Sequence, residues 1–323
     1  MAVAIPPCSR ARVMRLRSIR THTSFLRTTV VSLLWVTRAL WFCLPVSVGW
    51  AIDDATRAWD RAPTITLAIF AYTAWLIGCI GLLLPSARAF TALRIVAALP
   101  LVAVVLSAFA TSTAAIVFAA VHATFTTTFA LSAAVADASA QAQAYGDEIR
   151  RPLRTPPVFC LVTAVAVALI VSGIVLGPCL IASGHTLAGV IVTIVGVPIA
   201  AILIRSVHTL SQRFYVFVPA GLVISDSMVL TDPVLLASER IDGFAQFDGN
   251  SHPRPEVTID TRGGALVGCI AVRLNEPGSF AVRDGRRSMR MRDADVVMFT
   301  PLRPRDFLAL ASPPTANPHA PVH

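Results

Sequence analysis

The sequence contains no lysine and little charge of either sign. Every basic side chain other than histidine is arginine, a bias typical of GC-rich coding sequences. Charged residues make up 14% of the 323-residue chain, hydrophobic residues make up 55%, and the mean hydropathy is +0.69. A composition this apolar excludes an ordinary soluble globular domain.

The sequence also lacks the short motifs that mark common active sites and metal sites. Its six cysteines are scattered with no C-x-x-C pair, so their spacing supports neither a zinc site nor a disulfide framework. It has no H-E-x-x-H, G-x-S-x-G, Walker loop or G-x-G-x-x-G. We therefore expect no catalytic residue, no cofactor and no metal site, and we expect that the protein is not an enzyme.

Long apolar runs are the main feature that is present. A run of about 20 apolar residues, rising about 1.5 Å per residue, crosses the ~30 Å hydrocarbon core of a bilayer. Six such runs are predicted as transmembrane helices: residues 28–51, 64–84, 90–110, 113–134, 158–176 and 186–204. Gly173 and Gly177 form a G-x-x-x-G spacing, which indicates close helix packing, either within the chain, as we favour, or between two copies of it. The sequence thus predicts a six-helix transmembrane domain over residues 28–205, with Pro45, Pro100 and Pro198 as candidate kinks.

The distribution of charge indicates the orientation of these helices. Residues 1–205 contain 15 Arg and 6 acidic residues, whereas residues 206–323 contain 12 of each, so the net charge of +9 belongs to the membrane half. Arginines cluster in the tail, residues 1–27, and then in every second connection, which places both termini in the cytoplasm. We interpret the positive charge as the topology signal of a multi-pass protein of the cell (inner) membrane and expect no nucleic-acid partner.

After residue 205 the hydrophobic pattern changes from helical to alternating. Runs rich in Val, Ile and Phe predict strands at 213–218, 221–225, 227–236, 241–247, 257–261, 266–274 and 296–300. Turns are expected between them, including Pro277-Gly278 and Asp284-Gly285. An amphipathic helix is predicted at 304–311, and the Pro-rich end, 313–323, should be disordered. Residues 206–312 are therefore predicted to form an all-β split barrel or sandwich with one capping helix.

Arg38 is the sharpest polar feature within the predicted spans, because it lies near the middle of the first one. An arginine there costs about 2.5–3.5 kcal/mol on insertion scales. Trp35, Trp41 and Phe42 share its helical face, so a cation–π cage is feasible. One interpretation is an intramembrane site for an anionic ligand or lipid, formed by Arg38, Trp35, Trp41 and Arg94. The other is an arginine bonded to backbone carbonyls or Thr hydroxyls of neighbouring helices.

His122 is the one ionisable residue of the predicted fourth span. A proton relay would need an intramembrane carboxylate, and no acidic residue lies within any predicted span. We therefore favour a hydrogen-bonded packing histidine over a relay.

The loop after the fourth span carries Tyr145, Asp147 and Glu148 just before Arg150 and Arg151. Paired carboxylates can bind a metal or act as acid and base. Because arginines adjoin them, a salt-bridged loop, or one that docks on the C-terminal domain, is favoured.

Five arginines crowd one stretch of the C-terminal domain: Arg283, Arg286, Arg287, Arg290 and Arg292. Near an anionic leaflet each basic side chain contributes about 1 kcal/mol of attraction. The stretch is either a hairpin that faces an anionic membrane surface or a solvated charged turn.

Several sequence blocks carry a resemblance to known proteins. They are Arg38-Ala-Leu-Trp41, Thr91-Ala-Leu-Arg94, Tyr145-Gly-Asp-Glu148, Arg213-Phe-Tyr-Val-Phe-Val-Pro-Ala-Gly221 and Thr300-Pro-Leu-Arg-Pro304. On these blocks the chain resembles a family of actinobacterial six-span membrane proteins with no assigned activity. The strand after Gly221, the Glu239-Arg-Ile241 step and the final helix are similar to bacterial pleckstrin-homology-like domains. The resemblance implies a location and a domain type, and it supplies no catalytic residues.

We therefore expect a non-catalytic integral membrane scaffold or sensor with a cytoplasmic pleckstrin-homology-like domain. Its expected partners are membrane lipids, with a protein partner of the C-terminal domain and self-association as further expectations. The alternative is a small transporter or channel whose pathway passes Arg38 and His122. A polar cavity at the bilayer midplane would favour the transporter, and a closed bundle would favour the scaffold.

Overall fold

The computed structural model divides the chain into a helical unit and a β-rich unit. It describes residues 23–84, 86–110, 112–247, 257–265, 267–285 and 288–311, without the side chains of 23–31, 113 and 157. The helical unit comprises Thr28–Gln143 and Val158–Ser211, and the β unit contains Ala144–Pro157 and the chain from Gln212 onward. The predicted disordered end, nearly all of the basic tail and the side chain of Arg27 lie outside the described residues.

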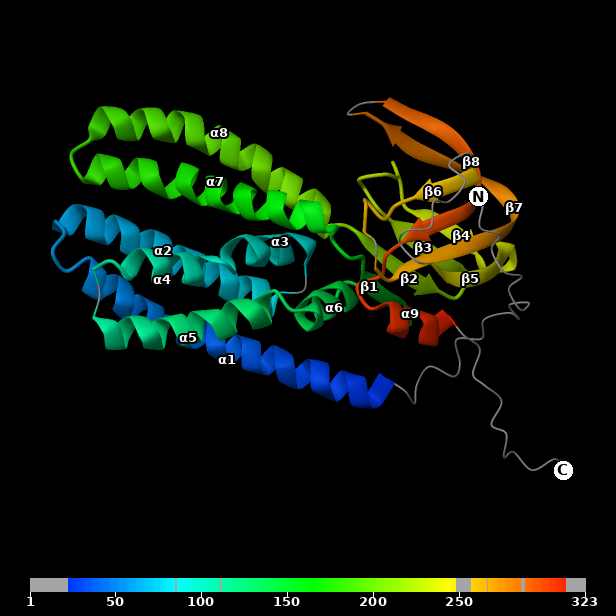
Figure 1. Ribbon diagram of the computed structural model, residues 1–323, viewed down its shortest axis with the longest axis horizontal. Coiled ribbons are helices and arrows are strands. Elements are labelled where there is room, and N and C mark those ends of the chain that lie inside the picture. The colour runs from blue at the N-terminus through cyan, green and yellow to red at the C-terminus, as the bar shows by residue number, and fades with distance from the viewer. Residues whose placement is uncertain are drawn as a thin grey trace. The chain divides into compact units, whose positions relative to one another are not determined.

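The helical unit consists of long apolar helices, as the hydropathy predicts (Figure 1). Its helices are α1 (Thr23–Ala55), α2 (Arg61–Leu83), α3 (Ala87–Val96), α4 (Leu99–Ser107), α5 (Thr113–Ala130), α6 (Ala133–Gln141), α7 (Pro157–Ala182) and α8 (Thr186–Ser211). Within the described residues, five spans are long and apolar enough to cross a membrane, with α3 and α4 counted as one. A sixth results if α5 and α6, which meet at a 43° bend, form one span. The membrane-compatible helical class is therefore confirmed, with five or six spans.

Pro100 explains why the third span is broken into α3 and α4. A proline has no N–H to donate to the carbonyl four residues earlier, which here belongs to Val96, the last residue of α3. The Thr127 hydroxyl of α5 donates to the neighbouring carbonyl of Ala97 at 2.8 Å in a buried position. A threonine of an adjacent helix thus satisfies a backbone group at the break, as backbone at membrane depth requires.

Glycines bring α7 and α8 into backbone contact, and the two helices run side by side as a hairpin (Figure 1). A Cβ added to Gly173 would lie 2.7 Å from the Gly196 carbonyl oxygen, and one added to Gly189 would lie 2.7 Å from that of Gly177. No side chain fits at these positions without moving the backbone. The G-x-x-x-G spacing therefore acts within the chain, between α7 and α8.

The described residues of the β unit form two four-stranded sheets, a short 3-10 helix (Ser238–Arg240) and one α-helix. The first sheet has the antiparallel order β1-β2-β3-β4, formed by β1 (Ile149–Pro152), β2 (Phe214–Val218), β3 (Gly221–Ser225) and β4 (Val234–Ala237). The second has the order β5-β7-β8-β6, formed by β5 (Ile241–Phe247), β6 (Thr258–Asp260), β7 (Cys269–Asp284) and β8 (Ser288–Phe299), with β6 parallel to β8. Helix α9 (Pro304–Ala311) follows, with the bounds that the sequence predicts.

Strand β1 departs from the predicted domain plan. It comes from the loop between α6 and α7, yet it pairs with β2 in register from Ile149↔Phe217 to Pro152↔Phe214. A single C-terminal domain over 206–312 is therefore incomplete, because the loop between two membrane-compatible helices supplies an edge strand of the sheet. The prediction of a β-rich domain is confirmed. The prediction did not include the loop between α6 and α7, which forms part of this domain.

The β7–β8 hairpin is longer than predicted. The predicted strand ends at residue 274 and is followed by a predicted turn at Pro277-Gly278, but β7 continues to Asp284 with a register shift between Arg273 and Gly278. Proline cannot donate to a ladder, and the strand accommodates it as a bulge. The predicted turn at Gly285 is present, where φ is +85°.

Phe307 of α9 joins the two sheets into one core. Its fully buried ring lies 5.3 Å from Tyr215 and 5.2 Å from Phe217, both on β2, measured between ring centroids. It also lies 5.4 Å from Phe244 of β5 and 5.2 Å from Phe299 of β8. Aromatic pairs at such distances contribute beyond the burial of their area. Helix α9 therefore closes the open side of the paired sheets, as a capping helix does.

A buried ion pair connects four segments of this unit. Arg213 Nη2 donates to Asp226 Oδ2 at 2.8 Å, and these side chains are 3% and 0% exposed. The same guanidinium donates to the carbonyls of Thr261 at 2.7 Å and Arg154 at 3.2 Å. Removing one partner of a buried pair leaves an uncompensated charge, so both residues are needed for the fold.

Candidate functional site

Arg38 contacts the end of the neighbouring helix. Its Nε and Nη2 atoms donate to the Leu82 carbonyl oxygen at 3.2 and 3.0 Å, in the last turn of α2. The last carbonyls of a helix lack intrahelical donors and carry partial negative charge, which a guanidinium neutralises. The Arg38 guanidinium thus reaches the end of α2, and its contacts are those of an arginine bonded to a backbone carbonyl.

The expected aromatic cage around Arg38 forms only in part. The Arg38 guanidinium lies 4.9 Å from the Trp35 ring centroid, and Trp35 itself is 62% exposed. Trp41, in contrast, is 1% exposed and packs against Gly78 of α2, where even a Cβ would overlap its ring. Trp41 therefore contributes to the α1–α2 contact and does not share a site with Arg38.

His122 of α5 is bound to α1 through both ring nitrogens. Nε2 lies 3.0 Å from the Leu40 carbonyl oxygen, and Nδ1 is hydrogen-bonded to the buried Ser47 hydroxyl. Because a carbonyl only accepts, Nε2 carries a proton and donates to the Leu40 carbonyl. Both nitrogens are thus used in packing α5 on α1.

Arg94 occupies a different environment, between α3 and the last turn of α8. Its Nη1 donates to the Ser211 hydroxyl at 3.3 Å, and its guanidinium lies 4.4 Å from the Phe90 ring centroid. One turn away, Thr91 Oγ1 and His208 Nδ1 are 2.8 Å apart. Arg94 thus has other partners than Arg38, Trp35 and Trp41, and two of its neighbours, Ser211 and His208, are not among the residues predicted from the sequence.

The loop that holds Tyr145, Asp147 and Glu148 leads directly into β1. Tyr145 is 83% exposed, and its backbone N–H donates to Glu148 Oε2 at 3.4 Å, so the carboxylate closes a local turn. Arg150, in β1, stacks on Phe214 at 3.5 Å from the ring centroid. Burial lowers the pKa of Arg150, and the nearby Glu148 and Tyr145 partly oppose this shift. The loop thus docks on the β unit as a strand.

A second charged pair lies on the other sheet. Asp260 accepts from the Arg262 backbone N–H at 2.9 Å and from its guanidinium at 3.0 and 2.8 Å. Partial burial raises the pKa of Asp260, but the hydrogen bonds and charge of Arg262 outweigh it, so the net pKa lies below the usual value. The hydrogen bond to Asp260 raises the pKa of Arg262.

The arginine-rich stretch forms the end of the β7–β8 hairpin. Arg283 pairs with Met289 and Ala281 with Met291, whereas Arg290 and Arg292 pair with Val282 and Phe280. Directly opposite residues share a face of a sheet, so one face presents Arg283, Met289 and Met291 and the other presents Arg290 and Arg292. Met289 is 66% exposed and Met291 is 59% exposed. Arg286 and Arg287 lie outside the described residues.

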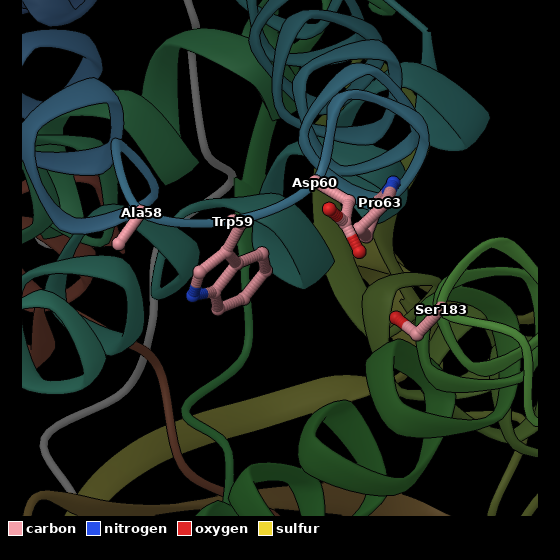
Figure 2. A pocket seen from close by; sticks show the side chains of 5 residues that line it. All are labelled: Ala58, Trp59, Asp60, Pro63 and Ser183. Carbon is pink, nitrogen blue, oxygen red and sulfur yellow. The ribbon is translucent and has the colours of Figure 1, made fainter.

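A hollow of about 310 Å³ lies at the end of the helical unit where α1 meets α2 and α7 meets α8. Figure 2 shows Trp59, Asp60 and Pro63 on one side and Ser183 on the other. Its lining contains a single carboxylate. Across the described part of the chain, no group of three or more His, Cys, Asp or Glu side chains is arranged to hold a metal ion.

Comparisons of the chain with models of protein families, with curated proteins and with solved structures gave no match. The family resemblance therefore rests on the sequence blocks alone, and the function is argued from the geometry of the residues above.

Proposed function

We propose that the protein is a non-catalytic, six-span scaffold or sensor of the cell membrane with a cytoplasmic pleckstrin-homology-like domain. In this proposal the domain seats its β7–β8 hairpin on the anionic lipid surface of the membrane. Membrane lipids are then the partners, and the actinobacterial family resemblance is part of the same proposal.

The observation that carries the proposal is the composition of the hairpin end. Two methionines are largely exposed beside Arg283 on one face, and two further arginines lie on the other face. Methionine is flexible and apolar, so it suits contact with acyl chains, while arginine stems can lie along the apolar region with their charge at the headgroups. Each arginine near an anionic leaflet adds about 1 kcal/mol of attraction.

The domain type is supported by the arrangement of the β unit. Two sheets share one core, and a C-terminal helix closes it through Phe307. This agrees with the split barrel and capping helix expected from the pleckstrin-homology-like pattern.

The scaffold is favoured over a transporter by the contacts of the polar groups that a pathway would use. Arg38 donates to the Leu82 carbonyl, and His122 bonds to Leu40 and Ser47. Groups that are committed to joining helices do not offer binding atoms to a moving solute.

The test is hydrogen–deuterium exchange of the full-length protein in lipid nanodiscs. The peptide that covers residues 279–294 is compared between neutral discs and discs with phosphatidylglycerol. We expect slower exchange in the anionic discs, lost at high salt and lost when Arg283→Ser and Arg290→Ser are combined. The matched control combines Arg240→Ser with Arg305→Ser, two exposed arginines of the same unit, and should keep the protection.

Protection that is equal in neutral and anionic discs would overturn the lipid-seated hairpin. Loss of protection in the control variant, to the same extent as in the hairpin variant, would also overturn the lipid-seated hairpin. The protection would then depend on the net charge of the β unit and not on the hairpin.

A further inference from the structure

The helical unit holds a guanidinium with no carboxylate to neutralise it. Helices α3, α7 and α8 contain no acidic residue. Within the described residues, no carboxylate lies within ion-pair distance of Arg94. An arginine among apolar helices is costly unless it is paired, so an anion from outside the unit is expected.

The donors of Arg94 are available for such an anion. A guanidinium has five N–H donors in a planar fork, and in the described part of the chain Arg94 makes one hydrogen bond, that of Nη1 to Ser211 Oγ at 3.3 Å. The Phe90 ring, 7% exposed, lies against the guanidinium and fixes its plane. The fork is thus oriented and mostly unused.

The neighbouring polar groups hold the guanidinium in place and leave phosphate binding to its own N–H donors. Thr91 donates to the Ala87 carbonyl at 2.8 Å, so its oxygen accepts from His208 Nδ1, which therefore carries a proton. His208 and Ser211 are three residues apart on α8 and lie on one face, as do Thr91 and Arg94 on α3. The two faces meet and hold the guanidinium beside Ser211, whose hydroxyl donates to the Val207 carbonyl at 3.2 Å, so the remaining Arg94 N–H groups are the donors for a phosphate.

The position along the helix indicates the source of the phosphate. Ser211 is the last residue of α8, so the site lies at the end of a membrane-compatible span. The headgroup region of a bilayer begins at this level.

We propose that the Arg94 guanidinium, held against α8 by Ser211, binds a phosphate group at the α3–α8 contact, and that an anionic phospholipid headgroup supplies it. This site lies in the helical unit and does not depend on the β7–β8 hairpin. A free phosphate ion offers the same chemistry, and the experiment separates the two sources.

The test is thermal unfolding of the detergent-purified full-length protein with three additives. They are phosphatidylglycerol, diacylglycerol with the same acyl chains, and inorganic phosphate. We expect phosphatidylglycerol to raise the midpoint and diacylglycerol to have no effect. Arg94→Gln should weaken the phospholipid affinity by about tenfold or more. The control is Arg88→Gln, which removes the same charge from an exposed position of α3 and should keep the full shift.

A midpoint shift by inorganic phosphate alone, lost in Arg94→Gln, would support the phosphate site and replace the lipid with a free ion as its source. A phosphatidylglycerol shift that persists in Arg94→Gln would overturn the site, even if that variant is less stable without lipid. An equal shift with diacylglycerol would overturn it as well, because the phosphate would then contribute nothing.

Discussion

Trp41 and Trp75 exchange hydrogen bonds across the α1–α2 contact. The Trp41 indole donates to the Trp75 carbonyl at 2.9 Å, and the Trp75 indole donates to the Trp41 carbonyl at 3.1 Å. Pro45 lies four residues after Trp41 in α1 and has no N–H for that carbonyl. The indole of a neighbouring helix therefore replaces the donor that proline removes.

Trp75→Phe should lower the stability of the helical unit by about 1–3 kcal/mol, since a buried carbonyl loses its donor. Pro45→Ala supplies a backbone N–H to the same carbonyl, so Trp75→Phe should be less damaging in that background. Thermal unfolding of the purified full-length protein gives the double-mutant cycle. Equal destabilisation in both backgrounds would show that the Trp75 indole does not compensate for the proline.

Arg38→Leu should leave membrane insertion intact and lower thermal stability by about 1–2 kcal/mol, because the charge-assisted bonds to the α2 end are lost. Arg38→Lys should recover part of the loss, since an ammonium still reaches the carbonyl. Arg88→Leu, at an exposed position, serves as the control. An unchanged midpoint together with altered solute flux in proteoliposomes would instead favour a pathway past Arg38.

The β unit should fold without the membrane helices only when β1 is included. Pro152 pairs with Phe214, and the Leu153 N–H donates to the Arg213 carbonyl at 3.1 Å, so the end of β1 lies beside the start of β2. A Gly/Ser linker of about four residues can therefore join residue 156 to residue 212 in place of α7 and α8. We expect the chain 146–156–linker–212–311 to be soluble and to unfold cooperatively in circular dichroism, whereas 212–311 alone should aggregate through the exposed β2 edge. Equal behaviour of the two chains would show that β1 is dispensable.

Arg213→Met should destabilise the β unit by about 3–5 kcal/mol, because Asp226 is left as a buried unpaired charge. Adding Asp226→Leu removes that charge and should restore most of the stability. Urea unfolding of the β1-containing fusion measures both. A double variant no more stable than the single one would mean that the hydrogen bonds from Arg213 to the Thr261 and Arg154 carbonyls dominate.

The stability of the β unit should fall on acidification in part through Asp260, whose native pKa lies below the usual value. The stabilisation by a carboxylate of this kind is complete above its unfolded-state pKa of about 3.9 and is lost as pH falls through the native pKa. Asp260→Asn should therefore be less stable than wild type near neutral pH, and the difference should shrink in acid. Urea unfolding of the fusion over a pH series measures this. A difference that is constant with pH would exclude the ion pair as its cause.

Elements whose pattern is local could be predicted from the sequence. Strand β5 and helix α9 have the predicted bounds, because the turn sequence Asp248-Gly-Asn250 marks the end of the strand and helical spacing begins after Thr300. Strand β1 gave no such signal, since it has four residues and depends on a partner beyond two long helices. The predicted first strand of the β7–β8 hairpin is too short, because Pro277 was interpreted as part of a turn. That residue is tolerated because β5 pairs with β7 only as far as Leu274.

The same limit applies to the polar residues. The sequence raised both alternatives for Arg38, but the carbonyl that it binds belongs to another helix and is known only once the helices are packed. Arg94 could be predicted as a site residue because it is a charged residue in an apolar span. His208 and Ser211 could not, because only the packing of α8 against α3 brings them next to Thr91 and Arg94.

The origin of β1 sets an order for biosynthesis. Residues 149–152 leave the ribosome before α7 and α8, but their pairing partner β2 is made after both helices. The first sheet cannot be completed until the α7–α8 hairpin has been synthesised, because β2 follows that hairpin in the chain. During this interval the backbone groups of β1 that pair with β2 in the folded protein have no partner strand. Completion of the first sheet therefore reports that the last two helices have been synthesised.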